Sequence, residues 1–100
     1  MFERIAFLKL RPDHATADNQ RVIAARALEV LPRLPGVQAI TVGIAADDDS
    51  RTAWDLCITA QFASRADAAM YRAHPDHRRF VDEYLAPQCE ARKAWSFETP

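Results

Sequence analysis

Alternation of apolar and polar residues predicts four β-strands in this chain. The clearest alternation covers residues 54–62, where one face of the strand carries Trp54, Leu56, Ile58, Ala60 and Phe62. Residues 4–10 are apolar on both alternating faces, so we expect this strand to lie in a sheet that is covered on both sides. The other two strands are predicted at residues 37–46, which are rich in small and β-branched residues, and at residues 91–98.

Apolar residues at helical spacing predict a first helix between the first two strands. The helix starts at Thr16, a suitable N-cap, and runs to about Leu34, where Pro35 and Gly36 turn the chain. Its buried stripe consists of Ile23, Ala27, Val30, Leu31 and Leu34. Pro32 lies late in this run, and we expect it to distort or end the last turn.

A second helical region follows the third strand and is interrupted near its middle. Ser64 is the predicted N-cap of its first part, which would turn inward Ala66, Ala69, Met70 and Ala73. Pro75 suits the first position of a new helical segment, and this segment should close before Pro87. From His77 onward, a single stripe at helical spacing is formed by His77, Phe80, Val81, Tyr84 and Leu85. A titratable imidazole therefore leads an apolar helix face.

The order strand, helix, strand, strand, helix, strand is typical of the ferredoxin-like α+β fold. In this fold both helices cover one face of a four-stranded antiparallel sheet, and we expect residues 1–100 to form a single such domain. The apolar faces of the predicted helices and strands should meet in a core between helices and sheet. The residues expected in this core are Ile23, Leu31, Leu56, Ile58, Phe62, Phe80 and Val81.

The opposite face of the sheet should carry a large apolar surface. Its large side chains are Ile5, Phe7, Trp95 and Phe97, accompanied by Cys57 and Thr59. A soluble monomer rarely exposes an apolar patch of this size. We therefore predict a homodimer in which two copies cover this face mutually and the two sheets form a barrel-like interior.

Composition narrows the classes of partner and cofactor. The formal net charge is −1 and basic residues are scattered among acidic ones, which argues against nucleic acid or an anionic membrane as a partner. No signal peptide or membrane span is apparent, so we expect a cytoplasmic protein. Cys57 and Cys89 lie far apart without a C-x-x-C motif, and we expect no disulfide, metal or cofactor. The acidic run 47–50 lacks the glycine and distal glutamate of a calcium loop and is predicted as a solvated hairpin connection.

A resemblance to a known family rests mainly on the run Tyr71-x-x-His74-Pro75-x-His77-x-x-Phe80. Weaker matches are Phe62-x-Ser64, Leu34-Pro35-Gly36-Val37, Gly43 and the aromatic final strand. Together these residues resemble the stress-responsive dimeric α/β-barrel (Dabb) proteins over essentially the whole chain. The resemblance implies a dimeric α+β barrel with a cavity in each subunit between the helices and the sheet.

Plant polyketide cyclases of the olivetolic acid cyclase type are the relatives whose reaction is best understood. There a histidine matching His77 is the general base and a tyrosine matching Tyr71 assists it, so the resemblance implies these two catalytic roles. A second histidine on the first strand and a tyrosine on the first helix line the cyclase cavity, whereas this chain has Arg4 and Ala27 at those positions. The predicted ligand-binding residues are Arg4, Leu8, Ala27, Ile58 and His74.

Each candidate side chain also has a purely structural interpretation. His77 either packs while holding a backbone carbonyl or serves as a base in a pocket. Tyr71 is either an aromatic at the helix edge or a hydrogen-bond donor, and His74 is expected to cap the helix break. Arg4 either binds a carboxylate in the cavity or, as we expect, pairs with a nearby acid.

Three function classes remain open from the sequence. The favoured class is a dimer that binds a small apolar or aromatic compound without turnover, because two positions differ from the cyclases. The second class is a cofactor-free, cyclase-like enzyme that uses His77 as general base and Tyr71 as donor. A monooxygenase of the related cofactor-independent type is the third, by analogy of fold alone. In each case the ligand is predicted to lie beneath the break at 74–75, between that helical region and the first strand.

Overall fold

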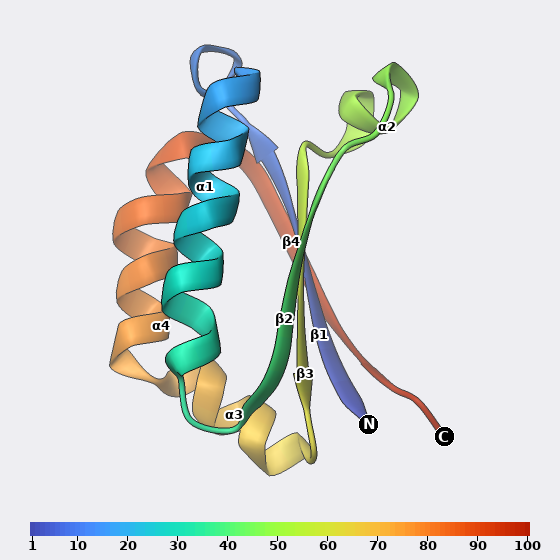
Figure 1. The fold of residues 1–100 in the computed structure, drawn as a ribbon, viewed down its shortest axis with the longest axis vertical. Helices are drawn as coiled ribbons and strands as arrows, with labels where there is room; N and C mark the ends of the chain where they lie inside the picture. The colour runs from blue at the N-terminus through green and yellow to red at the C-terminus, as the bar shows by residue number, and fades with distance from the viewer.

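Four antiparallel strands form one sheet, and the long helices cover only one of its faces (Figure 1). The computed structural model describes residues 1–100. The strands are β1 (Phe2–Leu10), β2 (Val37–Ile44), β3 (Leu56–Phe62) and β4 (Cys89–Glu98). Their order across the sheet, β2-β3-β1-β4, is that of the predicted ferredoxin-like fold, which is thereby confirmed.

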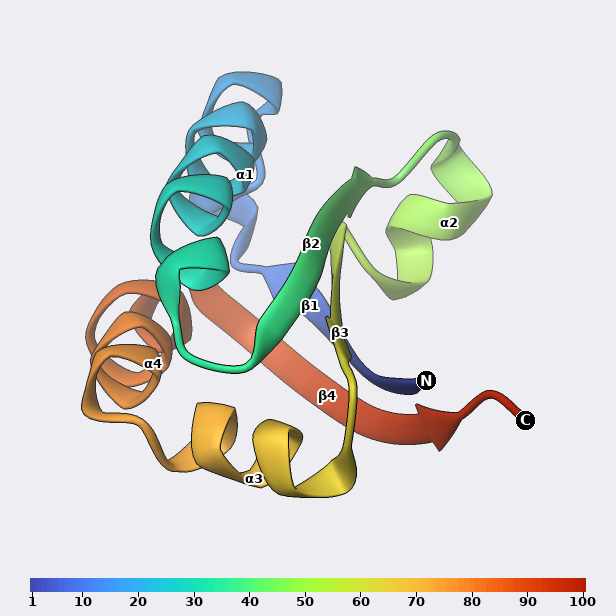
Figure 2. The same ribbon diagram turned by 60° about the horizontal axis from the view of Figure 1, so that its bottom comes forward.

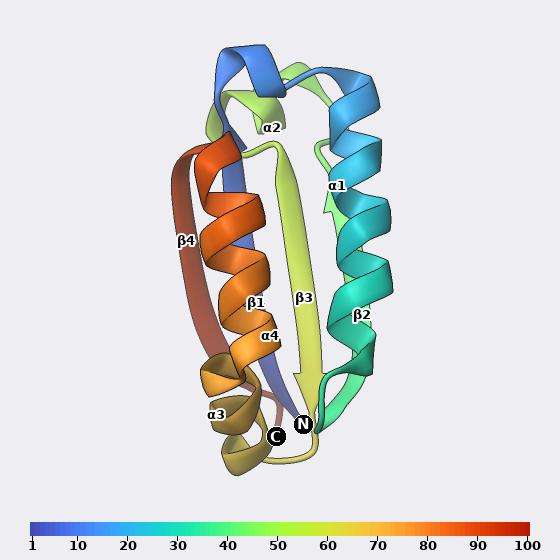
Figure 3. The ribbon, with the colours of Figure 1, turned by 90° about the vertical axis from the view of Figure 1, so that its left-hand side faces the viewer.

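Two long helical regions lie side by side on the covered face of the sheet (Figure 3). The helices are α1 (Ala17–Val30), α2 (Asp48–Ala53), α3 (Arg65–Ala73) and α4 (Pro75–Arg79). Helix α1 lies on the β2 side of the sheet and α4 on the β4 side. The predicted caps are present, because the Thr16 and Ser64 hydroxyl oxygens accept backbone hydrogen bonds at 3.1 and 3.2 Å. None of these helices combines the length and the apolar character that a membrane span requires.

The second helical region changes geometry twice after α3. At His74 the backbone becomes extended, with φ −62° and ψ 134°, and Pro75 then starts α4. Figure 2 shows α3 and α4 as separate segments that meet at this break. Beyond α4 the chain forms a π-helix, Phe80–Leu85, in which the N–H of Ala86 donates to the carbonyl of Val81. The predicted end before Pro87 is slightly early, since a 3-10 turn continues the helical path through residues 86–88.

The core lies between the helices and the sheet, as the periodicities predict. Six of the seven predicted core residues are at most 5% exposed, namely Ile23, Leu31, Leu56, Ile58, Phe62 and Phe80. Val81 is partly buried and packs against this cluster. Each such side chain contributes about 1.5 to 3 kcal/mol when fully buried, so this layer is the main source of hydrophobic stabilisation.

Helix α3 buries a different face from the one predicted. Its buried residues are Ala68 and Tyr71, whereas Met70 is 54% exposed and the alanines expected to face inward are exposed as well. The ring of Tyr71 packs on Phe62 with ring centroids 5.0 Å apart, and this contact sets the rotation of the helix. Small apolar residues occur around most of α3, so its sequence does not define one apolar face.

The connection between β2 and β3 is exposed, as predicted, but it is helical rather than a simple turn. The Asp47 carboxylate caps α2 by accepting a hydrogen bond from the backbone N–H of Ser50 at 2.8 Å. Within the helix, Arg51 pairs with Asp48 at 2.7 Å, three residues apart. An acidic run that caps its own helix therefore replaces the expected hairpin connection.

Strand β3 begins later than the alternation suggests. Asp55 is only 3% exposed, and its carboxylate accepts a hydrogen bond from the N–H of Leu10 at 2.8 Å. Because Asp55 is turned inward, Trp54 does not share the core face and instead packs against Phe7, with ring centroids 5.7 Å apart. The prediction that Trp54 belongs to the inward face of the strand is therefore wrong.

No long helix covers the other face of the sheet, which we call the outer face (Figure 1). Trp95 and Phe97 are 49% and 55% exposed there. Ile5 pairs with Trp95 across β1 and β4, and the ring of Phe7 lies 5.9 Å from that of Trp95. A single chain therefore carries the predicted apolar patch on its surface.

Candidate functional site

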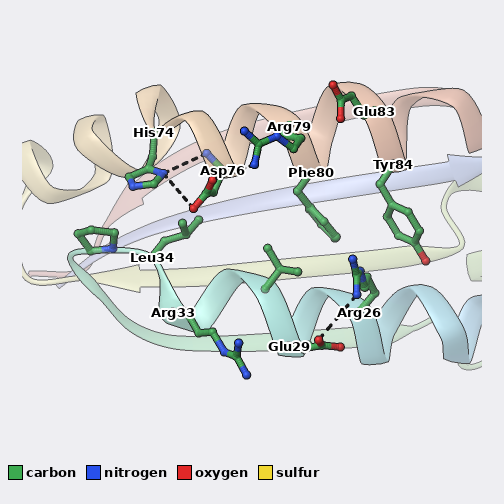
Figure 4. Close-up of a pocket in the computed structure, with 12 residues that line it drawn as sticks. Arg26, Glu29, Arg33, Leu34, His74, Asp76, Arg79, Phe80, Glu83 and Tyr84 are labelled. Carbon is green, nitrogen blue, oxygen red and sulfur yellow. Dashed lines mark hydrogen bonds and ion pairs between the residues drawn. The ribbon is translucent and has the colours of Figure 1, made fainter.

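Two hollows adjoin the second helical region, and their linings differ. The first, which we call the sheet-side pocket, has a volume of about 570 Å³ and lies between residues 71–86 and strands β1, β3 and β4. The second, the interhelical groove, has a volume of about 670 Å³ and lies between α1 and residues 74–84 (Figure 4). Hydrophobic residues make up 12 of the 19 residues that line the pocket but only 4 of the 12 that line the groove. The sheet-side pocket therefore has the mainly apolar lining typical of ligand sites.

Alternate residues of β1 form the floor of the sheet-side pocket. Arg4, Ala6 and Leu8 all line it, because side chains two residues apart share one face of a strand. Ala6 pairs with Ala94 of β4, and these two small side chains leave space above the sheet. Ile58 of β3 pairs with Ala6 on the other side and completes the apolar floor.

Tyr71 closes the pocket from α3. The residue is 4% exposed, and its ring centroid lies 4.3 Å from that of His77. Burial raises the pKa of Tyr71 to about 12, although the nearby charge of Arg4 opposes the rise. The phenol is therefore protonated at neutral pH and can donate a hydrogen bond.

His77 contacts a backbone carbonyl and also lines the sheet-side pocket. Its Nδ1 lies 3.2 Å from the carbonyl oxygen of Arg72. A carbonyl oxygen can only accept, so Nδ1 donates, and in the neutral ring Nε2 is the atom with a free lone pair. Burial is the main cause that lowers the pKa of His77, and the charges of Arg78, Arg4 and Arg72 lower it further. The His77 ring is therefore fixed by its hydrogen bond to the Arg72 carbonyl and is mainly neutral at neutral pH, and it forms part of the pocket wall.

Arg4 has no acidic partner, so the expected pairing with an acid is wrong. Its guanidinium donates to the Ser96 hydroxyl oxygen at 3.1 Å, and it takes part in no ion pair. Burial and the neighbouring charge of Arg72 lower the pKa of Arg4 from its very high ordinary value. Arginine nevertheless remains charged at neutral pH, so Arg4 places a positive charge at the pocket.

His74 lines the interhelical groove and not the sheet-side pocket. Its Nδ1 accepts a hydrogen bond from the backbone N–H of Asp76 at 3.1 Å, and the carboxylate of Asp76 lies 4.0 Å away (Figure 4). His74 is thus the N-cap of α4, which is the structural role expected for it.

Ala27 also lies away from the pocket. It is fully buried in the core and lines neither hollow. The reason is that α1 packs on the β2 side of the sheet, whereas the pocket lies toward β4. Five of the predicted site residues line one pocket, namely Arg4, Leu8, Ile58, Tyr71 and His77.

Three further arginines line the sheet-side pocket without being singled out by the sequence pattern: Arg72, Arg78 and Arg92. Arg72 directly follows Tyr71 and Arg78 directly follows His77, so their position next to these two candidates was the one feature of the sequence that could have identified them. Arg92 reaches the pocket because β4 pairs it with Leu8, and this register is not readable from the sequence. Neither hollow holds a group of three or more histidine, cysteine, aspartate or glutamate side chains that could bind a metal ion.

Comparison with known proteins places nearly the whole chain in one family. The family model described as "Stress responsive A/B Barrel Domain" (Dabb) matches residues 2–99. A stress-response A/B barrel domain-containing protein from Arabidopsis thaliana is 31% identical over 91 residues. That alignment covers 90% of this chain and 34% of the Arabidopsis protein, so the chain spans about a third of the length of that relative.

Solved structures show the same fold. A Dabb family protein with a ferredoxin-like fold from Mesorhizobium loti superposes with a TM-score of 0.83 at 19% identity, covering 99% of this chain and 96% of the other. A dimeric ferredoxin-like protein of unknown function from Thermobifida fusca superposes with a TM-score of 0.77 at 25% identity, covering 98% and 90%.

Proposed function

The chain belongs to the stress-responsive A/B barrel (Dabb) family, and on this premise we propose that its sheet-side pocket binds a small apolar or aromatic compound. One observation carries the proposal. A single hollow with a mainly apolar lining also contains the polar groups of Arg4, Tyr71 and His77. Ligand sites typically combine an apolar wall with a few polar groups that orient the bound molecule.

The dimensions of the pocket suit a compound of this kind. Its volume of about 570 Å³ falls within the roughly 300 to 1,000 Å³ usual for small-molecule sites. Leu8, Ile58 and Val81 offer apolar surface to a ring or a short chain. Removal of such ligand surface from water contributes roughly 25 cal/mol per Å².

We further propose that the working unit is a homodimer formed through the outer face. Support comes from Trp95 and Phe97, about half exposed on a face that no long helix covers. The Thermobifida fusca protein of the same fold is described as dimeric. Pairing of two outer faces would leave the sheet-side pocket, on the opposite side of each sheet, open in both copies.

A ligand screen by thermal shift tests the binding proposal. Small aromatic and apolar compounds are tested on the protein and on His77→Ala, and a pocket ligand should raise the Tm of the first but not of the second. His74→Ala is the matched control, because this histidine caps α4 and lines the other hollow. Each shift is measured against the ligand-free Tm of the same variant. A compound that shifts His77→Ala as much as the unaltered protein binds elsewhere, and a screen without any hit contradicts the proposal.

A second candidate function, cofactor-free catalysis with His77 as general base, is favoured by the orientation of its ring. The hydrogen bond from Nδ1 to the carbonyl of Arg72 leaves Nε2 to accept a proton. Tyr71 would then donate a hydrogen bond to the oxygen on which charge develops, and Arg4 would stabilise that charge. The direct assay is the exchange of the α-protons of an enolisable ketone for deuterium, measured in D2O in the presence of the protein. His77→Gln should abolish this exchange while binding persists, and exchange at the full rate in His77→Gln excludes the base role.

A further inference from the structure

The positive charge around the sheet-side pocket is not balanced by acidic side chains. Four arginines line it on the helix-facing side of the sheet, Arg4, Arg72, Arg78 and Arg92, whereas Glu90 is the single acid in the lining. Lys93 also borders the pocket, but its register opposite Phe7 places it on the outer face. Only Arg78 forms an ion pair, at 3.3 Å from Asp82.

This imbalance belongs to the pocket and is not a property of the whole protein. The formal net charge of the chain is −1. Most arginines elsewhere pair with an acid, as do Arg21, Arg26, Arg51, Arg65 and Arg79. Unpaired arginines are therefore concentrated where the molecule is hollow and apolar.

Arg4 and Arg72 form the centre of this positive charge. The charge of Arg72 lowers the pKa of Arg4, and both charges lower the pKa of His77, so the three groups influence one another across the pocket. Like charges brought together beside apolar surface are unfavourable unless an anion accompanies them. Arg4 gives a hydrogen bond to Ser96, and a guanidinium has further N–H groups with which to bind a carboxylate.

We infer that the compound bound in the sheet-side pocket is an amphipathic anion, a small aromatic or aliphatic carboxylate. Its anionic head lies between Arg4 and Arg72, and its apolar body lies on Ala6, Leu8 and Ile58. The inference rests on the proposed binding function and adds the chemical class of the ligand. Arg92 pairs with Leu8, four residues along β1 from Arg4, or roughly 13 Å at the usual rise per residue, so the backbone of Arg92 lies at the other end of the pocket floor from that of Arg4.

A matched pair of probes tests this charge preference. Binding of naphthoate and of its neutral counterpart naphthamide is measured by isothermal titration calorimetry on the unaltered protein and on R4Q and R72Q. We expect naphthoate to bind about tenfold more tightly than naphthamide or better, as charge-assisted hydrogen bonds allow. Each substitution should remove most of this preference and leave naphthamide binding little changed. R33Q is the control, because Arg33 is also without an ion pair but lines the interhelical groove (Figure 4).

The outcomes separate the charge inference from the binding proposal beneath it. Equal binding of the two probes, with both lost in His77→Ala, would keep the pocket as a binding site and overturn the anionic ligand class. A naphthoate preference that survives in both R4Q and R72Q would overturn the assignment of the head group to these arginines. Absence of binding by both probes would overturn the proposed function itself. Salt gives a second measurement, since added sodium chloride should weaken naphthoate binding and not naphthamide binding.

Discussion

The rings of Tyr71 and His77 lie 4.3 Å apart, although the two residues are six positions apart in the sequence. In a continuous α-helix, residues six apart point to different sides, because neighbours on one face are three or four apart. The extended residue His74 breaks the helix between them and allows both rings to face the same pocket. The helix break is thus what brings a phenol and an imidazole together.

The Tyr71 ring and its hydroxyl should have separable effects. Tyr71→Ala removes a buried ring packed on Phe62 and should lower the free energy of unfolding by about 3 to 5 kcal/mol. Tyr71→Phe keeps the ring, and the hydroxyl has no hydrogen-bond partner within the chain, so we expect a loss of about 1 kcal/mol or less. Urea denaturation of both variants measures the two values. Equal losses would show that the hydroxyl, rather than the packing, supplies the stabilisation.

The capping role of His74 can be measured against another histidine. His74→Ala removes the acceptor for the N–H of Asp76 and should destabilise the protein by about 1 kcal/mol. His14 is a suitable control, because the only hydrogen bond of its side chain is with the neighbouring Asp13, and His14→Ala should change stability by about 0.5 kcal/mol at most. Similar stabilities of the two variants would argue against a cap at this break.

His77 should make stability depend on pH in a defined direction. Its folded-state pKa lies below the ordinary 6.5, so on acidification the unfolded chain binds the proton first. The contribution of His77 is fully present above pH 6.5 and is lost as the pH falls from there through the folded-state pKa. His77→Gln should flatten the stability profile in this range, whereas the lowered pKa values of Asp13 and Asp47 act only at more acidic pH. An NMR titration that puts the pKa of His77 at or above its ordinary value would reverse the prediction.

The outer face should govern the oligomeric state. Trp95→Glu places a charge in the middle of the proposed interface and should convert a dimer into a monomer in sedimentation velocity runs at micromolar concentration. Met70→Glu is the matched control, since Met70 is equally exposed but lies on α3, on the helical side. If the unaltered protein is a monomer, the proposed interface does not exist. If the Trp95→Glu variant stays dimeric, the interface lies on another surface.

The fold was predictable because the strands and α1 repeat their pattern over many residues. Strict alternation identified Ile58 and Phe62 as core residues, and both are buried. The rotation of α3 was not predictable, because nearly all its small residues suit either side and the single contact of Tyr71 decides the face. The arginine arrangement was not predictable for another reason. Arg92 and Leu8 are more than eighty positions apart in the sequence, and only the register between β1 and β4 brings them together.

The π-helix Phe80–Leu85 lies between the two hollows, and its residues line both of them. Phe80 and Tyr84 line the interhelical groove, while Val81 and Leu85 line the sheet-side pocket. Removing one residue from this wide turn would restore ordinary helical spacing and rotate the side chains that follow by about 100° relative to those before it. Such a deletion would carry Leu85 from the pocket toward the groove and move Tyr84 out of its present place in the groove. The volumes of the two hollows are therefore linked, and a change in the length of this one turn alters both.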